Sequence, residues 1–167
     1  MRQPRQCAFA RGKDASVTDD PSVRTIHVFI VDDQALLRQS FQRLLQLEGA
    51  GIAVAGTAGD GQEALETLAR LEHTGELPEV VLMDVRMPRL DGVAATARIQ
   101  ARWPEVRVLI LTTFDDEEYI LAGLRAGAKG YLLKDATAEE LVSAIRAVAR
   151  GESPLQPSVA AKLVARF

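Results

Sequence analysis

The chain has 167 residues, of which 47% are hydrophobic and 26% are charged, and its formal net charge is −3. This length fits one ordinary domain with a tail, because globular domains cluster at roughly 100–150 residues. With this acidic balance the chain lacks the basic excess with which proteins bind nucleic-acid backbones, so if DNA is involved, something outside these residues contacts it.

The N-terminal stretch, residues 1–24, is polar and has no periodic pattern, so we expect a flexible leader. It lacks the apolar core of a secretory signal, and no apolar run in the chain approaches the roughly 20 residues of a membrane span. The single cysteine, Cys7, has no intramolecular partner, which is typical of a reducing compartment. We therefore expect a cytoplasmic protein without membrane contact.

A strand and a helix open the expected domain, which runs over residues 25–150. The run IHVFIVDD (26–33) is apolar, β-branched and too short for a helix, so it predicts a buried strand. In residues 34–47 the apolar side chains share one helical face, which predicts a helix that stops near Gly49.

This strand and helix unit then recurs along the chain. Further strands are predicted over 52–58, 80–85, 106–113 and 130–134, and further helices over 61–71, 92–101, 116–126 and 138–150, with His73 in a loop. Regular alternation with apolar strands predicts an α/β fold, a five-stranded parallel doubly wound sheet covered by helices on both faces. In such folds ligands bind at the carboxyl ends of the strands.

Polar side chains gather at those predicted strand ends. They are Asp32, Asp33, Asp84, Thr112, Thr113 and Lys134. Converging carboxylates repel one another unless a divalent cation lies among them, and oxygen ligands suit Mg²⁺. A lysine and a threonine hydroxyl can bind phosphate, and an aspartate can attack phosphorus. The set therefore predicts a Mg²⁺-dependent phosphoryl-transfer site with its own nucleophile.

Four motifs carry a family resemblance: VDD (31–33), MDVRMPRLDG (83–92), LTT (111–113) and GYLLKD (130–135). Over residues 26–150 the chain resembles the receiver domain of two-component response regulators, which has a flavodoxin-like fold. LTTFDDEEYI and GAKGYLLKDA resemble the NarL/FixJ type, in which a helix-turn-helix DNA-binding domain follows the receiver.

The resemblance implies a role for each strand-end residue. Asp84 would be the phosphoacceptor, and Asp32, Asp33, Asp84 and the backbone carbonyl of Arg86 would bind Mg²⁺. Thr112 and Lys134 would hold the phosphoryl oxygens, and Thr112 with Tyr131 would form the switch. The phosphodonor would be a sensor histidine kinase. Phosphorylation would favour a homodimer, and DNA would be bound only by an output domain that we expect to lie outside this chain.

The same resemblance implies a switch rather than an enzyme, with only self-phosphorylation and slow self-dephosphorylation. Arg86 and Phe114, two residues beyond Asp84 and Thr112, are poorly suited to orient a hydrolytic water. Residues 151–167 are expected to be a linker with the start of a helix. Its apolar face would contain Val159, Leu163, Val164 and Phe167.

Simpler interpretations remain open for single residues. Asp33 can be a helix N-cap, Tyr131 an edge-strand aromatic, and the acidic run 115–118 only a favourable charge at a helix N-terminus. The segment GTAGDG (56–61) lacks the spacing of a dinucleotide-binding motif.

Two alternative functions also remain. One is a stand-alone receiver that acts by protein contact. The other is a haloacid-dehalogenase-type phosphatase, which needs a second acid where this chain has Arg86.

Overall fold

The computed structural model describes residues 24–113 and 117–166. Five strands form one parallel sheet in the order β2-β1-β3-β4-β5. They are β1 (Ile26–Val31), β2 (Ile52–Ala58), β3 (Val80–Met83), β4 (Arg107–Thr112) and β5 (Gly130–Leu133). The predicted α/β fold, a doubly wound parallel sheet, is confirmed.

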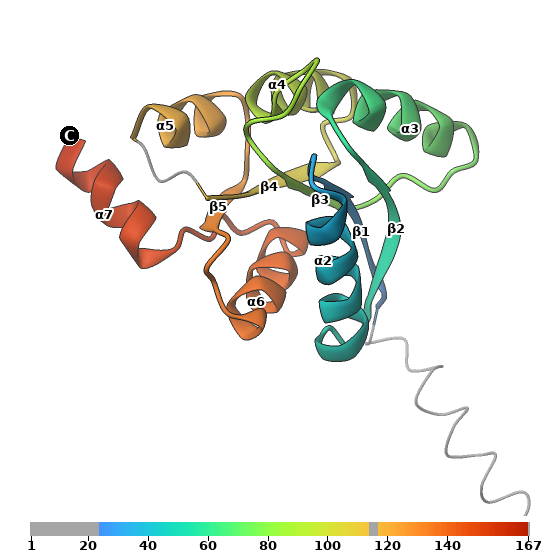
Figure 1. Cartoon of the computed structure of the whole chain (residues 1–167), viewed down its shortest axis with the longest axis horizontal. Helices are drawn as coiled ribbons and strands as arrows, with labels where there is room; N and C mark the ends of the chain where they lie inside the picture. The colour runs from blue at the N-terminus through green and yellow to red at the C-terminus, as the bar shows by residue number, and fades with distance from the viewer. Residues whose placement is uncertain (1–23, 114–116, 167) are drawn as a thin grey trace, which may run out of the picture.

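Helices cover both faces of the sheet (Figure 1). On one face lie α3 (Gly61–His73), α4 (Gly92–Arg102) and α5 (Glu117–Arg125), and on the other lie α2 (Ala35–Glu48) and α6 (Ala138–Ala149). No helix among the described residues is long and apolar enough to cross a bilayer.

The strands are buried on both sides, so alternate residues enter two separate cores. Phe29, Met83, Ile110 and Tyr131 pack on the side of α3, α4 and α5. Their sequence neighbours, such as Ile30, Leu82 and Leu132, pack on the side of α2 and α6. This double burial explains why the strands are apolar runs rather than alternating patterns.

The helix starts carry local signals that the sequence encodes. Asp60 caps α3 and Asp91 caps α4, each by accepting a hydrogen bond from a backbone N–H of the first turn. Thr137 and Glu140 form a reciprocal capping box at α6. The alternative that Asp33 caps α2 is wrong, because the N-cap is Gln34 and no side chain caps this helix.

Several predicted boundaries shift by a few residues. Strand β3 ends at Met83, so Asp84 follows the strand rather than lying in it, and α3 continues through His73 instead of leaving that residue in a loop. The start of the predicted helix 116–126 lies partly outside the described residues, which resume at Glu117.

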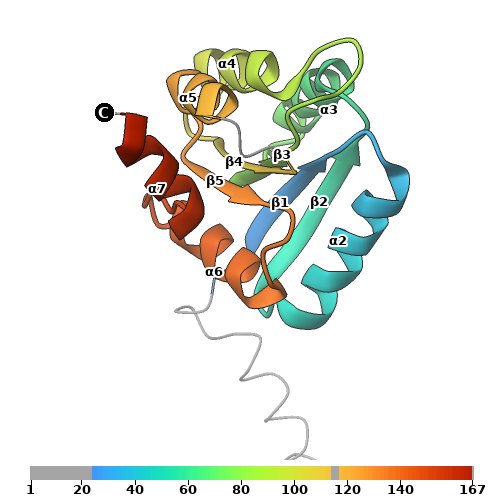
Figure 2. The ribbon, with the colours of Figure 1, turned by 60° about the vertical axis from the view of Figure 1, so that its left-hand side comes forward.

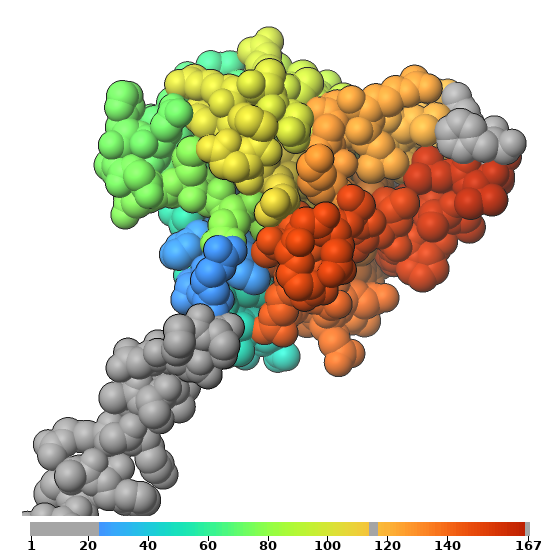
Figure 3. Space-filling model, turned by 180° about the vertical axis from the view of Figure 1, so that it is seen from behind, coloured from blue at the N-terminus to red at the C-terminus, as the bar shows by residue number. Residues whose placement is uncertain are grey.

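The last helix, α7 (Pro157–Arg166), packs beside α5 (Figures 2 and 3). Val159 is fully buried, and Leu163 packs against the core of the α5 face. Val164 is 75% exposed, so its predicted place on the apolar face is wrong: it lies one residue past Leu163, a rotation of about 100° around the helix. Phe167 and residues 1–23 lie outside the described part.

Candidate functional site

The expected site lies at the carboxyl ends of the strands, where the parallel topology brings distant residues together. Asp32 follows β1, Asp84 follows β3, Thr112 ends β4 and Lys134 follows β5. Asp32 and Lys134 are 102 residues apart in sequence, yet the Lys134 Nζ donates to Asp32 Oδ2 at 2.6 Å. The sheet order therefore assembles the cluster, because β1, β3, β4 and β5 are successive neighbours.

Asp84 is the second nearly buried carboxylate that contacts this lysine. Asp84 is 7% exposed. Its Oδ1 accepts a hydrogen bond from the Val85 N–H at 2.8 Å, and its Oδ2 accepts one from Lys134 Nζ at 3.2 Å. Burial raises the pKa of Asp84, the charge of Lys134 lowers it and the neighbouring Asp32 raises it, and the net shift is upward. This carboxylate therefore lacks full charge compensation.

Asp32 is held by more contacts than Asp84. It is 2% exposed, and its Oδ1 accepts a hydrogen bond from the Gln34 N–H at 2.9 Å while Oδ2 faces Lys134. Its backbone carbonyl accepts a hydrogen bond from Arg38 of α2 at 2.6 Å. No motif predicted this contact of Arg38, because an arginine in the first turns of a helix is usually a solvated surface residue.

Three carboxylate groups at this site can share a cation. Asp32, Asp33 and Asp84 each offer an oxygen, and these oxygens lie within 4.8 Å of one another. Two of the aspartates are buried and Asp33 is exposed, so one side of the cluster opens to solvent. An all-oxygen set that is partly open fits a hard divalent cation such as Mg²⁺, which keeps several waters.

Glycine at position 92 allows the chain to close tightly around Asp84. The Gly92 N–H donates to the Val85 carbonyl at 2.7 Å. A Cβ at Gly92 would lie 1.8 Å from the backbone oxygen of Asp84, which no side chain can tolerate. The loop between Asp84 and α4 is therefore compact, and the prediction that Gly92 begins the helix is confirmed.

Thr112 and Tyr131 lie on the same face of the sheet. Thr112 is fully buried, and its carbonyl accepts a hydrogen bond from the Lys134 N–H at 2.8 Å. The Tyr131 side chain is also fully buried, and its ring lies 3.7 Å from the Cβ position of Gly123 in α5. Both predicted switch residues thus connect the strand ends with the core under α5.

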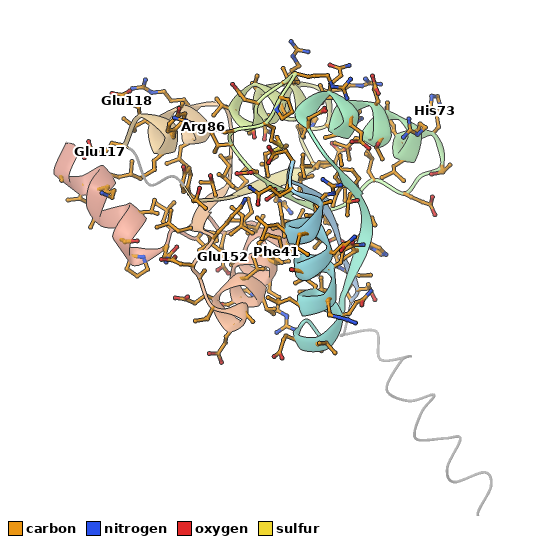
Figure 4. All side chains as sticks on the ribbon, in the orientation of Figure 1. Phe41, His73, Arg86, Glu117, Glu118 and Glu152 are labelled. Atoms are coloured by element: carbon orange, nitrogen blue, oxygen red, sulfur yellow. The ribbon has the colours of Figure 1, made fainter. Side chains whose placement is uncertain are left out.

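Arg86, whose backbone carbonyl was predicted to bind the metal, has its side chain beside α5 (Figure 4). The Arg86 guanidinium donates a hydrogen bond to the Tyr119 hydroxyl and lies 5.0 Å from the centroid of that ring. This contact of α5 with the loop after Asp84 was not predicted, because nothing in the sequence pairs residues 33 positions apart.

Comparison with known proteins agrees with the class that the fold defines, a receiver-type α/β domain. The model of the response regulator receiver domain family matches residues 28–146. The chain therefore belongs to the response-regulator receiver family, and its relatives are of the NarL/LuxR type. The match to the receiver family argues against the phosphatase alternative.

Curated relatives are longer than this chain. The uncharacterized transcriptional regulatory protein YxjL of Bacillus subtilis is 44% identical over 83% of the chain and 61% of the relative. The oxygen regulatory protein NreC of Staphylococcus carnosus is 40% identical over 84% and 62%. The chain thus spans about three fifths of the curated relatives it matches.

Two solved structures share the fold over nearly their whole length. A two-component response regulator of the LuxR family from Aurantimonas sp. has a TM-score of 0.75 at 30% identity, covering 85% of this chain and 97% of its own. The signal receiver domain of a proposed NarL response regulator from Mycobacterium tuberculosis has a TM-score of 0.69 at 36% identity, covering 77% and 99%.

Proposed function

We propose that this receiver accepts a phosphoryl group on Asp84 from a sensor histidine kinase, in a Mg²⁺-dependent reaction, and changes conformation in response. The observation that carries the proposal is the position of Lys134 Nζ, 3.2 Å from Asp84 Oδ2 and 2.6 Å from Asp32 Oδ2. This arrangement places one fixed cation between a candidate nucleophile and a candidate metal ligand. Family membership supports the same function.

Asp84 is the proposed nucleophile. One of its carboxylate oxygens forms a bond to phosphorus while the P–N bond of the phosphohistidine breaks, and the electron pair of that bond leaves on the imidazole nitrogen. The Val85 N–H, which bonds to Asp84 Oδ1, fixes the plane of the carboxylate for this attack. The product is an acyl phosphate on Asp84.

The neighbours of Asp84 would bind the charge of the incoming group. Lys134 and the Thr112 hydroxyl would contact phosphoryl oxygens, and Asp32, Asp33, Asp84 and the Arg86 carbonyl would hold the cation. When bound, Mg²⁺ neutralises negative charge on the carboxylates and on the phosphoryl oxygens. Lys134 already neutralises part of the carboxylate charge in the protein alone.

The conformational change on phosphorylation would be transmitted by Thr112, Lys134 and Tyr131. Phosphate contacts to Thr112 and Lys134 would favour one of two arrangements of the surface built from α5, β5 and α6. A ligand shifts such an equilibrium only by its differential affinity. Tyr131 supports this role because its ring packs under α5 on the Thr112 face.

The readout we propose is transcriptional. A homodimer of phosphorylated receivers would release or align a DNA-binding output domain outside residues 1–167, as the transcriptional relatives and their greater length suggest. The switch would act in the cytoplasm, where a regulator meets DNA. A stand-alone receiver that acts by protein contact is the alternative, and the coding sequence beyond Phe167 decides between them.

Labelling with acetyl phosphate tests the proposed chemistry. The wild-type chain with Mg²⁺ should gain one phosphoryl group by intact mass, whereas Asp84→Asn or excess EDTA should prevent the gain. Asp135→Asn, which removes an exposed aspartate next to Lys134, is the matched control and should label normally. Stable phosphate on the Asp84→Asn protein would refute the assignment. After removal of the donor, the label should persist well beyond seconds, in line with slow self-dephosphorylation.

A further inference from the structure

A buried carboxylate outside the aspartate cluster, Asp60, lies at the start of α3 and contacts the loop that follows Asp84. The Arg89 Nε donates to Asp60 Oδ2 at 2.9 Å, and its Nη2 donates to Oδ1 at 3.2 Å. Asp60 is 8% exposed and also accepts the capping hydrogen bond from the Glu63 N–H at 2.8 Å. Burial raises the pKa of Asp60, but the bonds from Glu63 and Arg89 outweigh it and lower the pKa overall. The pair is therefore a bidentate ion pair with an ionised aspartate.

The backbone of Arg89 is in an unfavourable conformation. Its φ is +67°, and no other non-glycine residue of the described ranges has a positive φ. The left-handed region is unfavourable for an L-residue other than glycine, so surrounding contacts must hold Arg89 there. The two parallel hydrogen bonds to Asp60 are such contacts, because a fork of this kind fixes both the position and the orientation of the guanidinium.

The next residue of the loop is also attached to α3. The Gly61 N–H donates to the Leu90 carbonyl at 3.0 Å, and a Cβ at Gly61 would lie 2.5 Å from that oxygen. Leu90 therefore sits directly on the helix start, and only glycine allows it. At the other end the loop is closed by the bond between Gly92 and Val85.

The loop 85–91 thus bonds to the start of α3 through Arg89 and Leu90. At α4, Asp91 caps the helix and the Gly92 N–H bonds to the first residue of the loop. Arg86 belongs to this loop and follows Asp84 by two residues, so the conformation of the loop sets where its carbonyl lies. Contacts that hold Arg89 therefore act on the carbonyl that would complete the cation site with the three aspartates.

We propose that Asp60 and Arg89 are positioning residues that clamp the loop 85–91, so that the Arg86 carbonyl and the Asp84 carboxylate are preorganised for a divalent cation. This inference rests on the proposed function, since it concerns the same site. Neither residue belongs to the carboxylate cluster, and both act through the loop. Supporting groups of this kind typically contribute to metal affinity without touching the metal.

Two single variants, here called the clamp variants, each remove the Asp60–Arg89 ion pair with little other change. Arg89→Asn removes the guanidinium but keeps a residue type that tolerates a positive φ. Asp60→Asn removes the charge but keeps an N-cap side chain. The matched controls are Arg102→Asn and Glu72→Gln. They break an exposed ion pair between α4 and α3, with an N–O distance of 3.4 Å and both side chains about half exposed.

The experiment measures Mg²⁺ binding to the full chain by calorimetry and amide hydrogen exchange of residues 85–91 in metal-free protein. In both clamp variants the Mg²⁺ dissociation constant should rise roughly tenfold, and exchange in the loop should accelerate, while the control variants match the wild type. The double variant Asp60→Asn/Arg89→Asn should be no weaker than the weaker single variant, because both remove one interaction.

The outcomes separate the clamp from the proposed function. If the wild type binds Mg²⁺ and is phosphorylated but the clamp variants bind Mg²⁺ equally well, the clamp is refuted and the proposed function stands. If loop exchange accelerates without any loss of Mg²⁺ affinity, the pair only stabilises the loop, and the inference is also refuted. If the wild type binds no Mg²⁺ and accepts no phosphoryl group, the proposed function fails first and the inference fails with it.

Discussion

Asp84 occupies an environment that disfavours its own charge. The carboxylate is nearly buried, and the only cation that contacts it in the described structure, Lys134, lies closer to Asp32 than to Asp84. Burial raises the pKa of Asp84 more than the charge of Lys134 lowers it, with Asp32 adding to the rise. A bound divalent cation or a phosphoryl group that meets Lys134 would change this balance in the folded state.

The raised pKa of Asp84 predicts that the free energy of unfolding depends on pH. Because its pKa is raised on folding, the native state holds a proton that the unfolded chain has lost between about pH 3.9, its unfolded pKa, and the raised value. Stability from this residue falls as pH rises through that window and stays lower above it. Without metal, the Asp84→Asn protein should be more stable than the wild type at pH 7, and the gap should close toward pH 4.

Urea denaturation at several pH values in EDTA measures this difference. The Asp135→Asn variant, at an exposed position, supplies the comparison for loss of one negative charge. A gap that widens on acidification would contradict the assigned direction of the pKa shift.

At the scale of the element, α7 is part of the folded domain rather than a loose extension. Val159 is fully buried against the α5 side of the core, while Val164, five residues later, is 75% exposed. Helix α7 thus contains one buried valine and one exposed valine. The predicted apolar face was right at Val159 and Leu163 and wrong at Val164.

This contrast gives a matched test of α7 packing. Val159→Ala should destabilise the protein by roughly 1–2 kcal/mol, since it removes two buried methyl groups and leaves a cavity. Amide exchange in α7 should accelerate with it. Val164→Ala should change neither quantity, and equal effects of the two substitutions would show that α7 is not docked in solution.

The sequence predicted the elements better than it predicted the contacts between loops. Apolar runs and helical periodicity located all five strands of the sheet, and the parallel topology implied that Asp32, Asp84 and Lys134 meet. The pair of Asp60 with Arg89 was missed because it depends on a positive φ that no periodicity encodes. The pair of Arg86 with Tyr119 was missed because it depends on how α5 packs above the loop.

At the scale of the whole molecule, the site exists only when the sheet is complete. Lys134 contacts Asp32, 102 residues away in sequence, and Asp84, 50 residues away, so a fragment that ends before β5 lacks the lysine that pairs with these carboxylates. Site geometry and global folding are thus coupled, and any change that shifts β5 also shifts Lys134. The neighbours of β5 therefore matter for the site as well as for the fold.

One such neighbour is the segment Pro154–Gln156, which runs along the outer edge of β5. The Tyr131 N–H donates to the Pro154 carbonyl at 3.3 Å, and the Leu133 N–H donates to the Gln156 side-chain oxygen at 2.8 Å. Leu155 forms an isolated parallel bridge with Tyr131. These contacts occupy backbone groups on the outer edge of β5, so the edge is not open for pairing with another molecule.

A receiver fragment cut after Arg150 would lose that cover, although the sequence pattern places a domain boundary there. Its β5 edge would be an open template for pairing with a second copy, so the fragment 24–150 should self-associate and precipitate at concentrations where 24–166 stays monomeric. Light scattering of both unphosphorylated fragments would measure the difference. A fragment 24–150 that remains monomeric would show that Pro154–Gln156 does not protect the molecule against aggregation.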